Sequence, residues 1–213
     1  MTRLAAELQR LYGAQPGQAD PQGGVRAFVL ELARPASWDA LGPVWRGVQA
    51  DLGLPSPGIA VSGSDGYQLW FSLSAPVPEA LAASFLEALR RRYLVEVAPE
   101  RIAIRGAVAP PVEVAPGRWS AFVAPDLAAL FAQEPWLDMP PGADAQSDLL
   151  SHLRSMHPDE LGGALDRLGH ATAQAAQAPE RQLDPKSFLL DVMNDRSLDM
   201  RLRIEAAKAL LQA

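Results

Sequence analysis

The chain has 213 residues, of which 48% are hydrophobic and 21% are charged, and its formal net charge is −6. This size suits one large or two small domains, and no apolar run is long enough to span a bilayer. Cysteine is absent, which excludes disulfides, thiolate nucleophiles and thiolate metal sites.

The negative charge is concentrated in the second part of the chain. Residues 1–118 carry 11 Lys or Arg and 11 Asp or Glu, whereas residues 119–213 carry 8 and 14. This balance argues against a strongly basic nucleic-acid surface. The densest basic run is Arg90–Arg92, and the helix dipole alone favours such a run at the end of a helix.

The first residues predict an amphipathic helix. Thr2 can cap it, and Gly13 ends it. Because this stretch lacks the uninterrupted apolar segment of a secretory signal, we expect a cytoplasmic protein. Residues 14–24, rich in Gly, Pro and Gln, predict a loop.

The next part of the chain predicts an α+β domain. Alternating apolar patterns predict strands at 25–32, 58–62, 67–73 and 101–105, and amphipathic patterns predict helices at 37–53 and 78–92. The order strand, helix, strand, strand, helix, strand is that of the ferredoxin-like βαββαβ fold, in which four antiparallel strands carry two helices on one face. In that topology the first and third strands are neighbours.

Beyond Gly106 the strand signal fades. The pattern predicts a short strand at 119–123, a helix at 127–132 and a linker at 136–145. Further helices are predicted at 149–156, 158–177, 187–193 and 200–211. We therefore predict an α+β domain at 1–135 and a helical region at 146–213.

A Gly-rich turn leads into a strand at Val61–Leu73, with the sequence VSGSDGYQLWFSL. This stretch resembles the second motif of archaeo-eukaryotic-type primases and related polymerases, and the resemblance covers roughly residues 25–105. In that family a histidine on this strand helps to hold the incoming nucleotide. Acidic residues on the first and last strands of the family's fold bind two divalent metal ions.

The chain departs from this family at each catalytic position. Gln68 stands in place of the histidine, the first strand supplies a single carboxylate, Glu31, and the last strand, Ile102–Arg105, supplies none. One carboxylate is a poor two-metal site. His152 and His157 are five residues apart, which is not the spacing of a metal pair on a helix. We therefore expect a catalytically degenerate protein, a pseudoenzyme without metal or cofactor.

The resemblance implies that binding of a nucleotide or of single-stranded nucleic acid survives on the sheet. If the apolar face of strand 67–73 packs under the helices, Gln68 and Trp70 lie on the opposite, open face, where an aromatic ring can stack on a base. The turn can also present backbone amides to a phosphate. The alternative is that the N-terminal helix, or the segment after Gly106, covers Trp70. The predicted binding residues are Arg26, Ser62, Ser64, Gln68, Trp70 and Arg105.

The last residues predict a helical hairpin. Asn194 and Asp195 break its first helix, and Asp199 can cap the second. The wording DVMND followed by MRLRIEAAKALL resembles a segment of small terminase-subunit-like proteins from phages of proteobacteria, over about thirty residues.

Two functional hypotheses follow. The first is a non-catalytic nucleic-acid or nucleotide-binding accessory protein of phage or mobile-element type. The alternative is a protein-interaction or self-association module that binds no nucleic acid and meets its partner through the acidic helical region. Neither involves a membrane.

Overall fold

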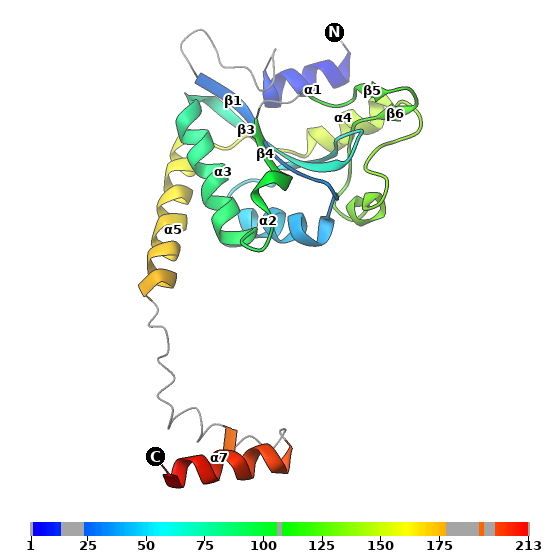
Figure 1. Cartoon of the computed structure of the whole chain (residues 1–213). Coiled ribbons are helices and arrows are strands. Elements are labelled where there is room, and N and C mark those ends of the chain that lie inside the picture. The colour runs from blue at the N-terminus through cyan, green and yellow to red at the C-terminus, as the bar shows by residue number, and fades with distance from the viewer. Residues whose placement is uncertain (1, 14–23, 106–107, 178–191, 194–198, 213) are drawn as a thin grey trace. The chain divides into compact units, whose positions relative to one another are not determined.

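The computed structural model describes residues 2–13, 24–105, 108–177, 192–193 and 199–212 (Figure 1). Contacts divide the chain into two units, Met1–His170 and Ala171–Ala213. The domains predicted at 1–135 and 146–213 stay a prediction. None of the described helices has the length and apolar character needed to cross a bilayer.

The first unit is built on a five-stranded antiparallel sheet of order β4-β1-β3-β2-β7. Its strands are β1 (Gly24–Ala33), β2 (Gly58–Val61), β3 (Gly66–Pro78), β4 (Ile102–Arg105) and β7 (Ala121–Phe122). The predicted pairing of the first and third strands is confirmed, with Leu30 opposite Leu69. The mixed α+β class is confirmed, although the sheet has five strands where four were expected.

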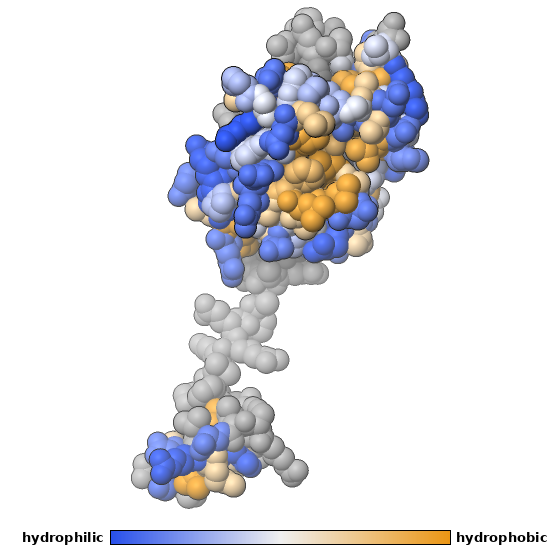
Figure 2. Space-filling model, turned by 90° about the vertical axis from the view of Figure 1, so that its right-hand side faces the viewer, coloured by the Kyte–Doolittle hydropathy of each residue, from blue (hydrophilic) through white to orange (hydrophobic). Residues whose placement is uncertain are grey.

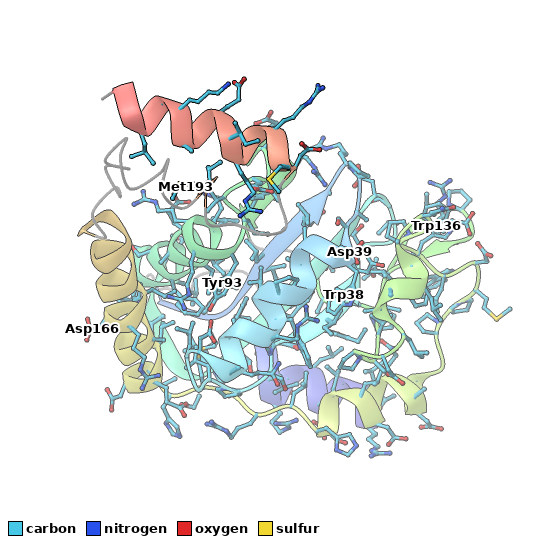
Figure 3. The ribbon with its side chains drawn as sticks, turned by 90° about the horizontal axis from the view of Figure 1, so that it is seen from below. Trp38, Asp39, Tyr93, Trp136, Asp166 and Met193 are labelled. Atoms are coloured by element: carbon cyan, nitrogen blue, oxygen red, sulfur yellow. The ribbon has the colours of Figure 1, made fainter. Side chains whose placement is uncertain are left out.

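Helices α2 (Trp38–Ala50) and α3 (Glu79–Tyr93) cover one face of the sheet (Figure 1). Ser37 caps α2 as predicted, because its Oγ accepts from the Ala40 N–H at 3.3 Å. Tyr93 reaches from the end of α3 towards α2 (Figure 3) and donates to Asp51 at 2.8 Å. Helix α5 (Pro158–Gln177) adds Leu161, Ala164 and Leu168 to this core.

The opposite face is also covered, which corrects the expectation that helices lie on one face only. Helices α1 (Arg3–Tyr12) and α4 (Ala143–Ser151) pack there in a second apolar cluster. Thr2 caps α1 as predicted, accepting from the Ala5 N–H at 3.2 Å. The Arg10 guanidinium joins the two helical segments by donating to the carbonyls of Leu150 and Leu153 at 2.9 and 3.1 Å.

The segment between β4 and α4 is more ordered than the sequence predicts. A short hairpin forms from β5 (Glu113–Ala115) and β6 (Arg118–Trp119), and a 3-10 turn, η2 (Ala128–Phe131), stands within the helix predicted at 127–132. Another 3-10 turn, η1 (Pro99–Arg101), precedes β4. Helix α4 begins inside the predicted linker and ends at Ser151. The helix predicted at 149–156 is therefore shifted, because the apolar groups of α4 pack on α1 and β7.

The second unit contains α7 (Met200–Gln212), which matches the helix predicted at 200–211. Asp199 caps it as predicted, since its Oδ1 accepts from the Arg201 N–H at 2.8 Å. Residues 184–191 and 194–198 of the predicted hairpin lie outside the described residues.

Candidate functional site

The hairpin turn between β2 and β3 uses its backbone amides internally. The Oγ of Ser62 accepts from the N–H groups of Gly66 and Ser64 at 2.9 and 3.2 Å. The Gly63 N–H donates to the Pro135 carbonyl at 2.9 Å, and Gly63 has a φ of 82°. These three amides are therefore not directed at a phosphate, which corrects that expectation. Ser62 shapes the turn, and Ser64 beside it is exposed.

Trp70 is 1% exposed and takes part in a chain of side-chain hydrogen bonds. Its indole N–H donates to Gln68 Oε1 at 2.9 Å, and Gln68 Nε2 donates to Glu31 Oε2 at 3.0 Å. Glu31 and Gln68 face each other across β1 and β3. Gln68 therefore satisfies the buried indole N–H of Trp70.

Two aromatic rings cover Trp70. The Tyr12 ring of α1 lies 5.2 Å from it, and the Phe122 ring of β7 lies 5.9 Å from it, centroid to centroid. The expectation of an open face around Trp70 is wrong, and the alternative, cover by the N-terminal helix and the segment after Gly106, is confirmed. The sequence cannot decide this, because α1 and β7 are far from β3 along the chain.

The two basic members of the predicted site lie on β1 and β4. Arg26 donates to the Leu73 carbonyl at 3.4 Å from two of its nitrogens. The backbone of Arg105 pairs with β1 opposite Val29, and its side chain lies outside the described part of the structure.

The run Arg90–Arg92 is largely neutralised by carboxylates. Arg90 and Arg91 bind Glu87 at 2.7 and 2.9 Å, and Arg92 binds Asp51 at 3.2 Å. The hydrogen bond from Arg90 is the main cause that lowers the pKa of Glu87 to about 2. Within the described residues, no group of three His, Asp or Glu side chains could hold a metal ion.

A large apolar groove lies at the β7 edge of the sheet, and the sequence interpretation missed it. Figure 2 shows hydrophobic surface gathered at the centre of the face that carries α4, with hydrophilic surface around it. The groove has a volume of about 470 Å³. Its walls are Phe122, Val123, Ala124, Leu127, Phe131, Leu137, Ala145, Asp148, Leu149 and His152.

A smaller side pocket adjoins the groove and shares Phe122, Val123 and Leu149 with it. It holds about 60 Å³ and extends to Trp45 and Gly58. The Trp45 indole N–H donates to the Pro57 carbonyl at 3.1 Å, which fixes this wall.

The walls of the groove are held by hydrogen bonds. Leu137 exchanges two backbone hydrogen bonds with Trp119, at 2.9 and 3.0 Å. Gln146, which is 4% exposed, accepts from the Phe122 N–H at 2.8 Å and donates to the Phe122 carbonyl at 2.9 Å. The side-chain amide of Gln146 therefore takes the place of another strand at the edge of the sheet.

The surroundings of the groove are acidic. Between Trp119 and Leu153 the chain carries five carboxylates and no Lys or Arg: Asp126, Glu134, Asp138, Asp144 and Asp148. Asp148 lines the groove and binds Arg3 of α1 at 2.7 Å. Among the described residues, no Lys or Arg forms an ion pair with the other four. This one-sided charge was the signal in the sequence that could have pointed to the groove.

No family model and no curated protein matches this chain.

Proposed function

We propose that this protein is a protein-interaction module that receives apolar side chains of a partner in the groove between β7, η2 and α4. The observation that carries the proposal is the groove itself, about 470 Å³ in volume and lined almost entirely by apolar side chains. Contiguous exposed apolar surface bordered by polar residues marks interaction sites in soluble proteins.

Exposed apolar residues next to the groove support this proposal. Leu127 in its wall is 47% exposed, and Leu130 and Met139, which follow nearby in the chain, are 77% and 70% exposed. Burying apolar area contributes about 25 cal/mol per Å², so covering these side chains favours association.

The nucleic-acid hypothesis has less support in the geometry. Trp70, the proposed stacking platform, is under Tyr12 and Phe122, and the arginines of α3 are paired with carboxylates. Bases need exposed aromatic faces, and phosphates need unpaired cations. We therefore favour the interaction module over the nucleic-acid-binding accessory protein. Kinship with primases and with phage terminase-like proteins, and a cytoplasmic location, stay predictions.

We also propose that the unit from β1 to β4 is ferredoxin-like. Its four strands stand in the order β4-β1-β3-β2, with α2 and α3 on one face. On this view β7, α1 and α4 are additions. These additions cover the sheet face opposite α2 and α3, and they form the groove at the β7 edge of the sheet.

Site-specific photocrosslinking tests the proposed function. The full chain carries a benzophenone amino acid either at Leu127, inside the groove, or at Val95, which is 73% exposed outside it. Irradiation in the native host should give a defined adduct to a second protein from position 127 only. Equal labelling at both positions, or none, would contradict the proposal. Salt-sensitive binding of labelled single-stranded DNA by the unmodified protein would restore the nucleic-acid hypothesis.

A further inference from the structure

We infer that the groove receives an amphipathic helix of a partner protein whose apolar face is flanked by Lys or Arg. This inference rests on the proposed function and specifies the chemistry of the partner. It follows from three features: the helical walls of the groove, the closed strand edge beside it, and the acidic side chains around it.

The walls of the groove have helical spacing. Ala145, Asp148, Leu149 and His152 of the α4 segment are separated by three, one and three residues, so they form one helix face. Leu127 and Phe131, at the two ends of the 3-10 turn η2, also line the groove. A groove lined by a helix face and a helical turn accommodates the apolar face of another helix, with anchors at i, i+3, i+4 and i+7.

A partner strand would find no free hydrogen-bonding groups at Phe122. Strand addition requires outward backbone N–H and C=O groups on the edge strand. At β7 both groups of Phe122 are bound by the Gln146 side chain, and the Val123 N–H donates to the Ile59 carbonyl at 2.9 Å. Contact at Phe122 must therefore come from side chains, which favours a helix over an extended strand.

The charge of the partner follows from the surroundings of the groove. Asp126, Asp138 and Asp144 each adjoin a lining residue in the chain, and each is exposed. Arg3 is the one described cation that pairs with a carboxylate of this segment. Lys or Arg side chains beside the partner's apolar row complement these carboxylates, whereas Asp or Glu side chains there are repelled by them.

Peptide titration against the full chain tests the inference. The probes are three fluorescein-labelled 16-residue peptides. The first has Leu at i, i+3, i+4 and i+7 with Lys between, the second has Glu in place of each Lys, and the third has the first peptide's composition in strict alternation. We expect the first to bind at least about tenfold more tightly than the other two at low salt, and to weaken as salt rises.

Matched variants assign the binding to the groove. Leu127→Asn should weaken binding of the Lys peptide at least about tenfold, while Val95→Asn should leave this binding unchanged. Both side chains are already exposed, and only Leu127 lines the groove. Asp144→Lys should weaken binding of the Lys peptide several-fold more than Asp166→Lys does. Asp166 is an exposed residue of α5 outside the groove (Figure 3).

Each other outcome overturns the inference. If the Glu peptide binds as tightly as the Lys peptide, the partner need not be basic. If the alternating peptide binds as tightly, the partner need not be a helix. If no peptide binds, both parts of the inference are wrong. A twofold increase in mass by light scattering that Leu127→Asn abolishes would assign the groove to a second copy. The proposed function would still stand in each case if the crosslink from position 127 forms.

Discussion

The hydroxyl of Tyr12 lies directly over the backbone of Gly58. A Cβ at position 58 would stand 2.8 Å from the Tyr12 Oη, so the close approach of α1 to β2 requires glycine there. The same oxygen is the one buried side-chain polar atom without a hydrogen-bond partner among the described residues, and burial raises the pKa of Tyr12. Tyr12 therefore covers Trp70 with its ring and at the same time buries a hydroxyl that has no hydrogen-bond partner.

This contrast between ring and hydroxyl gives a first prediction. Tyr12→Phe keeps the ring and removes the buried hydroxyl, so stability should stay the same or rise by about 1 kcal/mol. The matched change Tyr67→Phe removes the hydrogen bond to the Ala128 carbonyl and should lower stability by about 1 to 2 kcal/mol. Urea denaturation of both variants measures the difference. A loss at Tyr12 as large as that at Tyr67 would mean that its hydroxyl has a partner after all.

Gly63 in the Ser-Gly-Ser-Asp-Gly turn gives the second prediction. It has a positive φ, and a Cβ there would lie 2.8 Å from the Ser120 backbone nitrogen. Gly63→Ala should therefore destabilise the protein by about 1 to 3 kcal/mol. Gly162→Ala in α5, where a Cβ meets nothing within 4 Å, should instead stabilise by about 0.5 to 1 kcal/mol. Thermal melting of the two variants should move in opposite directions.

Local patterns in the sequence predict the central part of the fold well. Alternation marks β1 and β3, capping residues mark the starts of α1 and α2, and the pairing of β1 with β3 follows from the order of the elements. These features depend on neighbours in the chain, so a single sequence contains them.

The second layer and the candidate site depend on contacts that local patterns do not contain. Strand β7 has two residues, and α4 begins in a stretch with Pro and Gly that indicates a linker. Both are fixed by Gln146, whose amide bonds Phe122 across 24 residues of chain. The pattern of β3 alone predicts that Trp70 lies on an open face, whereas the rings of Tyr12 and Phe122 cover it.

The Glu87 carboxylate gives a pH-dependent prediction. Its pKa falls from 4.5 to about 2, first through the hydrogen bond from Arg90 and then through Arg91. Because the folded pKa is the lower one, the stabilisation is present above pH 4.5 and is lost as the pH falls towards 2. Glu87→Gln should cost a small amount of stability at pH 7, and this cost should disappear near pH 2. Glu96→Gln, at an exposed residue after α3, is the control and should show no such trend.

The strongest structural prediction concerns Gln146, because one side chain joins α4 to the sheet edge. Gln146→Leu leaves both the buried N–H and the C=O of Phe122 without a partner and should lower the free energy of unfolding by about 2 to 4 kcal/mol. Gln133→Leu, at an exposed position, should change it by less than about 0.5 kcal/mol. Hydrogen exchange provides a local test, since the Phe122 amide should lose protection in the first variant and keep it in the second. A Phe122 amide that stays protected in Gln146→Leu would show that a group other than Gln146 closes the edge, and would contradict the role assigned to Gln146.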